Sequence, residues 1–300
     1  MLNNPYINED TILYWNGNYE NSNTANISLY SQSLHYGYAV FEGIRSYNVN
    51  SKSKAFKLKE HFERLQYSCN SAIIPFNYSY EKFKEIVYQV LEKNNLIESY
   101  IRPLVVCSPN MGLTKGVESY LIVQAWEWAG GYISNNIKIM TSSYERPNPK
   151  AFDIKAKISG HYINSIMASN EAKSKGFNEG MLLDQNGNVA EASGANIFYE
   201  KDGILYTPPV GYILPGITRA TCIDLAKSLG IVVIEKFFKP KEMQGADAAF
   251  FCGTAAEVVA IDSLNKIDFV KPWQETNCKK IQDAYKKIIV EESIKNEVFA

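Results

Sequence analysis

The stretch KISGHYINSIMASNEAKSKGFNEGMLLDQNGNVAEASGANIFYEKDGILYTPP, residues 157–209, combines one helical pattern with two hairpin patterns. A helix ending at Gly176 is predicted, because apolar residues before it recur at helical spacing: Ile163, Ile166, Met167 and Ala172. Residues 180–192 and 196–209 each read as two short strands around a turn that contains glycine. The stretch therefore predicts a strand-rich domain with at least one flanking helix.

The rest of the C-terminal half extends this domain. The run IKIMTS at 137–142 reads as a strand. The turn Leu214-Pro215-Gly216 leads into a helical pattern at 217–229, which Gly230 ends. A last amphipathic helix is predicted from the spacing of Ile281, Tyr285, Ile288 and Ile289.

The N-terminal half reads as α+β. A strand at 12–16 runs into a hairpin turn, and amphipathic helices are predicted at 59–73 and 79–94. The runs YIRPLVVCS (100–108) and SYLIVQAWEW (119–128) read as paired strands of a mostly antiparallel sheet.

A composition break separates the two halves. Ala129-Gly130-Gly131 reads as a linker, and a new strand follows it. We therefore predict a small domain at 1–128, a linker at 129–136 and a large domain at 137–300.

The composition is that of a soluble globular protein. The chain has 300 residues, of which 46% are hydrophobic and 21% charged, and its net charge is −1. A chain of this length can bury a substantial core. The near-zero charge, without a run of like charges, argues against a nucleic-acid groove or a polybasic membrane patch.

The chain shows no targeting or metal-binding pattern. Its N-terminus lacks the basic and apolar regions of a signal peptide, and no apolar stretch reaches the roughly 20 residues of a spanning helix. The five cysteines are scattered and odd in number, which favours free thiols in the cytoplasm. The three histidines do not fall at zinc-ligand spacings with them, so no metal site is expected.

Two glycine turns could bind an anion. The run LPGITR at 214–219 places a helix N-terminus after a glycine, where unpaired N–H groups and the Thr218 hydroxyl could hold a phosphate. The run FCGTAAE at 251–257 ends an apolar strand in small residues that let an anion approach the backbone. Taken singly, each could equally be an ordinary turn without a ligand.

Two ionisable residues could take part in catalysis. Lys157 lies on a strand-like run just before a helix, where its amine could act as a covalent catalyst. Glu191, in a strand of the following hairpin, could be a solvated carboxylate or the partner of a buried cationic ring nitrogen.

The order of these features carries more information than any one of them. The run from KISGHYIN through EASGANIF and GITR to GTAAE resembles the class IV (fold type IV) pyridoxal-phosphate aminotransferases. The N-terminal motifs SLHYGYAVFEGIRSY, HFERL and SYIRPLVV are similar to those of the branched-chain amino acid aminotransferases within that class. The resemblance extends from about residue 12 to about residue 264. It implies an α/β protein, with a small α+β domain, a larger β-barrel-like domain with flanking helices, and pyridoxal 5'-phosphate between the two.

The resemblance also implies roles toward the cofactor. Lys157 would hold pyridoxal phosphate as an internal aldimine and then act as the acid/base. Glu191 would bind the pyridine nitrogen, and Tyr162 the phenolic oxygen. The cofactor phosphate would be bound by Arg64, the Ile217 and Thr218 amides, the Thr218 hydroxyl and Thr254.

On the substrate side, the resemblance implies transamination of leucine, isoleucine and valine with 2-oxoglutarate. Tyr100 and the Thr254–Ala255 amides would bind the α-carboxylate. An apolar wall for the branched side chain would come from Phe41, Tyr36 and Tyr162. Arg102, with Arg45 in support, would bind the second carboxylate of glutamate, because a buried unpaired carboxylate costs several kcal/mol. At least a homodimer is implied, with the loop 109–114 of one subunit closing the pocket of its neighbour.

The sequence departs from the family pattern at two places, and three alternative functions are to be weighed against transamination of branched-chain amino acids. The sequence Trp128-Ala129-Gly130-Gly131-Tyr132 displaces Tyr132 by one residue from the family's pocket tyrosine. Lys157 is followed by Ile158-Ser159-Gly160-His161 where a small pair is more usual, and His161 is expected to be a packing residue and not a catalytic one. The rivals are a D-amino-acid aminotransferase, an aminodeoxychorismate lyase of the same fold, and a phosphate-ligand binding protein that has lost turnover. The pair Tyr100 and Arg102 argues against the lyase, and the presence of Lys157, Glu191 and Tyr162 together argues against the binding protein.

Overall fold

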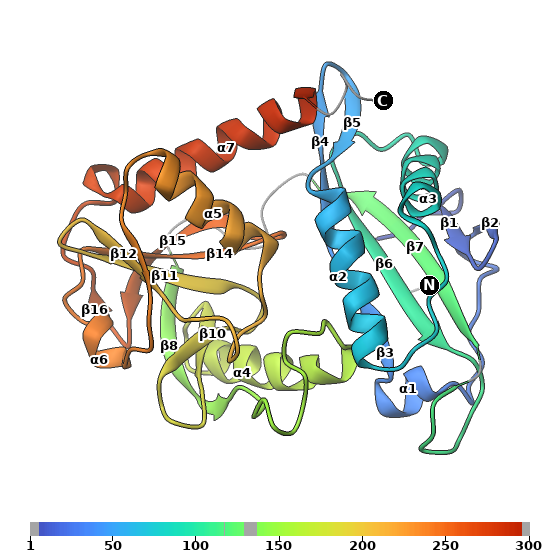
Figure 1. Ribbon diagram of the computed structural model, residues 1–300, viewed down its shortest axis with the longest axis horizontal. Coiled ribbons are helices and arrows are strands. Elements are labelled where there is room, and N and C mark those ends of the chain that lie inside the picture. The colour runs from blue at the N-terminus through green and yellow to red at the C-terminus, as the bar shows by residue number, and fades with distance from the viewer. Residues whose placement is uncertain (1–5, 117, 129–136, 296–300) are drawn as a thin grey trace. The chain divides into compact units, whose positions relative to one another are not determined.

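The computed structural model describes residues 6–116, 118–128 and 137–295, which divide into two compact units (Figure 1). The first unit takes its described residues from Met1–Gly130, Ala156–Gly160 and Ile289–Ala300, and the second from Gly131–Lys155 and His161–Ile288. The sequence assigned all of 137–300 to one domain, whereas the segment Ala156–Gly160, which contains Lys157, belongs to the first unit. The predicted linker at 129–136 lies outside the described residues, so the boundary there stays a prediction.

The first unit is built on a seven-stranded sheet in the order β2-β1-β7-β6-β4-β5, with β3 also pairing with β6. Its described strand pairs are antiparallel, as the sequence predicted for the two long runs that become β6 and β7. The strands are β1 (Ile12–Trp15), β2 (Asn18–Asn21), β3 (Ala39–Phe41), β4 (Ile44–Val49), β5 (Lys52–Ala55), β6 (Ser99–Cys107) and β7 (Ser119–Glu127).

Two helices cover one face of this sheet. The sequence predicted both of them, and they are α2 (Leu58–Ser71) and α3 (Tyr80–Lys93); a short helix, α1 (Gln32–Tyr36), precedes β3. Leu65 of α2 and Phe83 of α3 are fully buried in one core with Ile101 and Val123 of the sheet. Because side chains alternate along a strand, the neighbours of these core residues project from the opposite face.

The second unit contains a nine-stranded mixed sheet in the order β10-β9-β8-β15-β14-β11-β12-β13, with β16 also pairing with β15. Both predicted hairpins are present, as β9/β10 and β11/β12. The parallel pairs are β8 with β9, β8 with β15, and β12 with β13. The strands are β8 (Ile137–Glu145), β9 (Glu179–Leu183), β10 (Val189–Ala192), β11 (Asn196–Lys201), β12 (Ile204–Thr207), β13 (Val233–Glu235), β14 (Ala248–Gly253), β15 (Glu257–Leu264) and β16 (Ile267–Asp268).

This sheet curls, which confirms the barrel-like form expected from the sequence. In the strand order β10 and β11 are five positions apart, and neighbouring strands lie about 4.8 Å from each other, so a flat sheet would separate the two by about 24 Å. Only residues 193–195 connect them. Four chain steps span at most about 14 Å, so the sheet must bend back on itself.

The helices of the second unit are α4 (Tyr162–Ser174), α5 (Ile217–Ser228), α6 (Pro240–Met243) and most of α7 (Asn277–Lys295), together with the short 3₁₀ turn Trp273–Glu275. A further 3₁₀ turn, Ser159–His161, leads from the first unit into α4. The predicted helices correspond to α4, α5 and α7. In α4, however, the residues buried against the sheet are small, Ala168 and Ala172, because the helix lies close to Gly180, where a Cβ would come within 2.9 Å of the Ala168 carbonyl oxygen. The large apolar residues that predicted this helix are exposed: Ile163, Ile166 and Met167.

All five cysteines are buried free thiols, as the sequence led us to expect. Among the described helices, none combines the length and the apolar character needed to cross a membrane. In the described part of the chain, no three His, Cys, Asp or Glu side chains are grouped so that they could hold a metal ion.

Candidate active site

Lys157 lies in an irregular segment that the first unit holds by its backbone. Its N–H donates to Ser68 Oγ at 2.9 Å, and its carbonyl oxygen accepts from the Phe41 N–H at 3.1 Å. Three residues later the Gly160 N–H donates to the Gly37 carbonyl at 3.0 Å, and a Cβ on Gly37 would lie 2.7 Å from the Gly160 Cα. The sequence predicted a strand here, but the segment makes only an isolated bridge at Ile158, because its hydrogen bonds go to several different elements.

The Phe41 ring contacts both Lys157 and Arg102. Lys157 Nζ lies 4.6 Å from the ring centroid, and the Arg102 guanidinium carbon lies 4.8 Å from it. Arg102 also lies 5.3 Å from the Tyr100 ring, and its Nη2 donates to the Tyr100 hydroxyl at 3.3 Å. Within the described residues Arg102 has no carboxylate partner, and its buried Nε has no hydrogen-bond acceptor. It is therefore a guanidinium in an aromatic setting that could bind a carboxylate from outside the chain.

The sheet face opposite α2 and α3 carries further aromatic and cationic residues. Arg45 of β4 pairs in register with Tyr100, and Tyr100 with Trp126 of β7, so the three stand in a row. Arg45 is buried, with its guanidinium carbon 5.0 Å from the Tyr47 ring. The FEGIR motif requires a glycine at position 43 for a steric reason: a Cβ on Gly43 would lie 1.9 Å from the Tyr100 hydroxyl.

A buried ionic cluster surrounds Arg64. Glu42 accepts from Arg64 Nε at 2.7 Å and Nη2 at 2.9 Å, and His61 Nδ1 lies 2.7 Å from the same carboxylate. Burial alone would raise the pKa of Glu42, but the charges and hydrogen bonds of Arg64 and His61 hold it well below 4.5. Burial lowers the pKa of His61 against the opposing effect of Glu42, and the nearby charges of Arg64 and Lys157 add to the lowering. At neutral pH His61 is therefore neutral and donates its Nδ1–H to the carboxylate.

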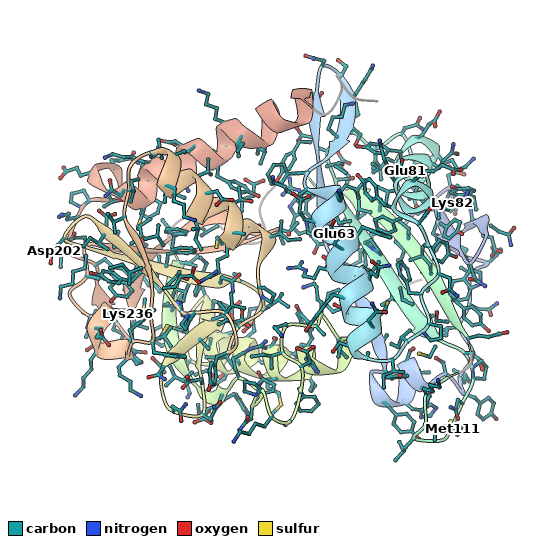
Figure 2. The ribbon with its side chains drawn as sticks, in the orientation of Figure 1. Glu63, Glu81, Lys82, Met111, Asp202 and Lys236 are labelled. Carbon is teal, nitrogen blue, oxygen red and sulfur yellow. The ribbon has the colours of Figure 1, made fainter. Side chains whose placement is uncertain are left out.

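Tyr36 lies beside the loop 109–114. Its side chain is 46% exposed, and its hydroxyl donates to the Met111 carbonyl oxygen at 3.1 Å. Gln32 donates to the carbonyl oxygens of Gly112 and Thr114 at 2.7 and 2.8 Å. The loop is thus held against α1 by hydrogen bonds, with Met111 on its outside (Figure 2).

Glu191 is buried in the second unit among donors from three segments. It forms an ion pair with Arg146 Nη2 at 2.8 Å, and it accepts from Asn196 Nδ2 at 3.0 Å and from the Leu214 N–H at 3.1 Å. The Leu214 bond ties the carboxylate to the turn that precedes α5. These bonds fix the position and orientation of the Glu191 carboxylate.

Gly216 and Arg219 fix the conformation of the turn that leads into α5. A Cβ on Gly216 would lie 2.0 Å from Asn196 Oδ1, and Gly216 caps the helix without any side-chain bond to the first amides. Arg219 is buried, donates to the Pro208 carbonyl at 2.8 Å and pairs with Glu235 at 2.6 Å. The arginine of this motif therefore fixes the helix start, while Ile217 and Thr218 lie in the first turn, whose amides have no intrahelical acceptor.

The remaining predicted residues of the second unit lie at element ends. Thr254 and Ala255 are half-buried in the turn between β14 and β15, and Tyr162 is the first residue of α4. His161 is buried with its ring 4.9 Å from that of Phe152, in keeping with the packing role predicted for it. Tyr132 lies outside the described residues.

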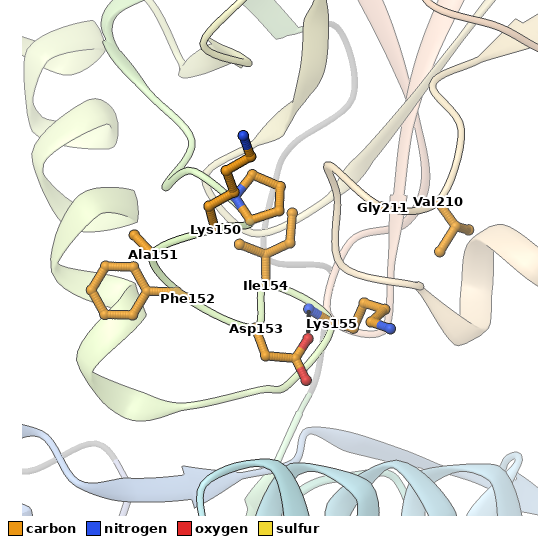
Figure 3. Close-up of a pocket in the computed structure, with 9 residues that line it drawn as sticks. Lys150, Ala151, Phe152, Asp153, Ile154, Lys155, Val210 and Gly211 are labelled. Carbon is orange, nitrogen blue, oxygen red and sulfur yellow. Dashed lines mark hydrogen bonds between the residues drawn. The ribbon is translucent and has the colours of Figure 1, made fainter.

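Lys155, the lysine nearest to Lys157, lies in a different environment. Together with Phe152, Ile154 and Val210 it lines a hollow of about 570 Å³ in the second unit (Figure 3). Its N–H donates to Asp153 Oδ1 at 3.2 Å. The two lysines therefore belong to different units of the fold, and the Lys157 amine lies beside the Phe41 ring.

The sequence reasoning missed four residues that support these sites: Glu42, His61, Arg146 and Asn196. Glu42 and His61 stand inside motifs that were quoted for other residues, FEGIR and HFERL. A buried arginine needs a carboxylate nearby, so a search for the partner of Arg64 could have led to Glu42. No local sequence signal links Arg146 with Glu191, because Arg146 lies in a loop and Glu191 lies in a distant strand.

Comparisons with known proteins identify the family of this chain. Residues 39–264 match the model of the family described as amino-transferase class IV. The branched-chain-amino-acid aminotransferase of Pseudomonas aeruginosa is 38% identical over 283 residues, covering 92% of both chains. The enzyme of the same name from Escherichia coli K12 is 36% identical over 282 residues, 91% of both chains.

Solved structures give the same result. The branched-chain aminotransferase of Thermoproteus uzoniensis with norvaline has a TM-score of 0.90 and 33% identity, covering 94% of this chain and 95% of its own. The branched-chain amino acid aminotransferase of T.th., complexed with N-(5'-phosphopyridoxyl)-L-glutamate, has a TM-score of 0.88 and 31% identity, with the same coverage. The family match and these relatives cover nearly all of the chain, and it therefore belongs to the class IV aminotransferases, among the branched-chain-amino-acid aminotransferases.

Proposed function

We propose that this chain transfers the amino group of L-leucine, L-isoleucine and L-valine to 2-oxoglutarate, giving branched-chain 2-oxo acids and L-glutamate. The cofactor in this proposal is pyridoxal 5'-phosphate, bound covalently by Lys157. The names of the relatives support the substrate class, and one related structure is a complex with a phosphopyridoxyl-glutamate compound.

One observation carries the substrate assignment. The Phe41 ring contacts both the Lys157 amine and the Arg102 guanidinium. Lys157 Nζ lies 4.6 Å and the Arg102 guanidinium carbon 4.8 Å from the ring centroid. An apolar ring next to the reacting amine suits a branched side chain, whereas a guanidinium without a carboxylate partner among the described residues suits the second carboxylate of glutamate. Substrates of both kinds could thus use the same aromatic wall.

The residues fit the ring of the cofactor. Lys157 supplies a primary amine on a segment that three backbone hydrogen bonds fix in place. Glu191 supplies a buried carboxylate whose position Arg146, Asn196 and Leu214 hold, and it is assigned to the protonated ring nitrogen. Tyr162 is assigned to the phenolic oxygen of the same ring.

The residues also fit the phosphate. The N-terminus of α5 offers amides that no side chain caps, after a glycine that admits no Cβ. Thr218 adds a hydroxyl, and Thr254 lies in a second turn of small residues. Arg64 is assigned to the phosphate as well, and its pairing with Glu42 holds the guanidinium in place.

In the reaction the cofactor, when bound, withdraws electrons from the substrate so that the proton on Cα becomes acidic. Lys157 Nζ would act as the base that takes this proton. Glu191 keeps a negative charge next to the ring nitrogen. Tyr100 and the Thr254–Ala255 amides hold the α-carboxylate, and Arg102 holds the distal carboxylate of glutamate.

A panel of amino donors tests the proposal. Purified protein is incubated with 2-oxoglutarate and either L- or D-leucine, isoleucine or valine, and glutamate formation is measured. We expect turnover of the L-enantiomers, retained in a Lys155→Ala control and lost in Lys157→Ala. Turnover of D-amino acids alone, or pyruvate release from an aminated chorismate, would replace the proposal with one of the rival activities.

We further propose that the chain works as a homodimer or a higher homo-oligomer. The first unit exposes Leu29, Leu34 and Leu113 at 73, 56 and 87%. The helix α4 exposes Ile163 and Ile166 at 61 and 54%. Exposed apolar patches are typical of surfaces that a partner covers. In this assembly the loop 109–114 of one subunit would close the pocket of its neighbour.

Sedimentation velocity of the wild-type chain and of a Leu113→Asp variant tests the assembly. We expect a dimer or larger species for the wild type and a weaker assembly for the variant. A monomeric wild type at micromolar concentration would contradict the proposal.

A further inference from the structure

The buried Ser68 hydroxyl of α2 joins two segments that lie far apart in the sequence. Its Oγ accepts from the Lys157 N–H at 2.9 Å, and its O–H donates to the Arg64 carbonyl oxygen at 2.8 Å. The residue is 0% exposed, so bulk water does not reach these groups. A helical serine often bonds back to the carbonyl four residues earlier, but the hydrogen bond from a segment 89 residues away is no property of the helix.

Phe41 and Glu42 connect the same two residues a second time. The Phe41 N–H donates to the Lys157 carbonyl oxygen at 3.1 Å. The carboxylate of the next residue, Glu42, accepts from Arg64 Nε and Nη2 at 2.7 and 2.9 Å. Ser68 therefore completes a closed cycle of contacts, all of it inside the first unit, that fixes Lys157 and Arg64 relative to each other.

Lys157 and Arg64 are the two residues that the first unit would offer to the cofactor itself. In the proposed function the Lys157 amine condenses with the aldehyde of pyridoxal phosphate and water is released, while the Arg64 guanidinium binds the phosphate. A ligand that is held at two points gains affinity only when the two binding groups match the distance between its own groups. The position of Lys157 relative to Arg64 therefore matters for this cofactor.

We infer that Ser68 is a positioning residue, which holds Lys157 and Arg64 at the separation that lets one molecule of pyridoxal phosphate use both. The inference rests on the proposed function, since it takes these two residues as cofactor ligands. The hydrogen bonds of Ser68 end on backbone atoms of both residues. Their removal would change the relative position of the two residues and leave their side chains and charges intact.

Three compounds test the inference. Of these two residues, pyridoxal phosphate can use both, pyridoxal only Lys157, and pyridoxamine phosphate only Arg64, because it has an amine in place of the aldehyde. In Ser68→Ala we expect the dissociation constant of pyridoxal phosphate to rise about three- to tenfold, the range of a single hydrogen bond. The dissociation constants of pyridoxal and pyridoxamine phosphate should stay at their wild-type values.

Ser46→Ala is the matched control. Ser46 is another fully buried serine of the first unit, and its hydroxyl bonds to the Ile97 carbonyl oxygen at 3.0 Å and to the Ser99 hydroxyl at 2.6 Å. We expect this variant to lose stability in urea unfolding as Ser68→Ala does, but to bind all three compounds like the wild type. Ser68→Cys fills the same space with a thiol that hydrogen-bonds only weakly, and it repeats the test if Ser68→Ala does not fold.

The outcomes separate this inference from the proposed function. Unchanged affinities for all three compounds in Ser68→Ala would overturn the inference and leave the proposed function standing. A loss for pyridoxal or pyridoxamine phosphate as large as that for pyridoxal phosphate would overturn it as well, because Ser68 would then not act on the separation of the two residues. If the wild type binds pyridoxal as tightly as pyridoxal phosphate, the assignment of the phosphate site fails first.

Discussion

Replacing Arg102 by leucine should separate the two substrates of the proposed reaction. Only glutamate brings a second carboxylate, and Arg102 is the guanidinium that the proposal assigns to it. Leucine instead meets the Phe41 ring, which the substitution leaves in place. We therefore expect a large loss for glutamate and a small one for leucine.

The surroundings of Arg102 set the size of the effect. Its guanidinium lies within 4.8, 5.3 and 6.0 Å of the rings of Phe41, Tyr100 and Trp126, so a carboxylate bound there would be largely removed from water. Removing one partner of a buried ion pair costs about 3–5 kcal/mol, and Arg102 is only partly buried, so a loss of about 2–4 kcal/mol is expected. At about 1.4 kcal/mol per factor of ten, the rate with glutamate should fall roughly 30- to 1000-fold.

The assay is single-turnover kinetics, in which each amino acid separately converts the bound aldehyde cofactor and the absorbance change is followed. Arg102→Lys serves as the control that keeps the positive charge, and it should retain part of the reaction with glutamate. Equal losses for leucine and glutamate in Arg102→Leu would refute the reasoning. Arg102 would then support the sheet, and Arg45 would be the next candidate for the distal carboxylate.

Three further substitutions test other parts of the account. Glu191→Gln should keep the cofactor bound but slow the half-reaction by about 3–4 kcal/mol, which single-turnover kinetics with leucine measures; a wild-type rate would contradict its role at the ring nitrogen. Glu42→Gln leaves the Arg64 guanidinium without its carboxylate and should destabilise the fold by about 3–5 kcal/mol in urea unfolding, so an unchanged urea midpoint would argue against the buried cluster. In Glu171, burial would raise the pKa, but hydrogen bonds from one lysine and two serines lower it from 4.5 to about 2, so its stabilisation is present above pH 4.5 and lost as the pH falls toward 2. Urea unfolding between pH 4.5 and 2 should therefore show a smaller loss of stability in Glu171→Gln than in the wild type, and equal losses would count against the assigned hydrogen bonds.

The sequence predicted the elements that carry strong local signals. The hairpin turns after β9 and β11 contain glycines with positive φ, at Gly187 and Gly203, and such turns show directly in the sequence. The helices α2 and α3 have one clear apolar face each, and both were predicted within one or two residues of their ends. The short strands β3 to β5 were not predicted, because their burial comes from pairing with distant strands.

The position of Lys157 could not be predicted from its neighbours in the chain. The local pattern suggests a strand of the second half, but the hydrogen bond from the Lys157 N–H goes to Ser68, 89 residues earlier. The same holds for Glu191, whose ion pair with Arg146 joins a strand to a loop 45 residues earlier. Contacts of this kind form only in the folded chain, so the spacing of residues along the sequence does not predict them.

Local signals indicated Lys157, Glu191 and the two glycine turns as candidates, whereas their roles and the other site residues came from the family resemblance. Lys157, Phe41 and Arg102 come together in the first unit, and Glu191 and the turn before α5 come together in the second. Their roles toward cofactor and substrate stay predictions. The physical reason is that the same N–H and O–H donors can bind several different anions. Only a bound ligand or the effect of a substitution distinguishes among these anions.

The most direct measurement of the central claim is the identity of the lysine that carries the cofactor. The protein is loaded with pyridoxal phosphate, reduced with borohydride and digested, and the labelled peptide is identified by mass spectrometry. The account predicts a pyridoxyl group on Lys157, whose amine lies 4.6 Å from the centroid of the Phe41 ring. A label on Lys155, or on any other lysine, would contradict it.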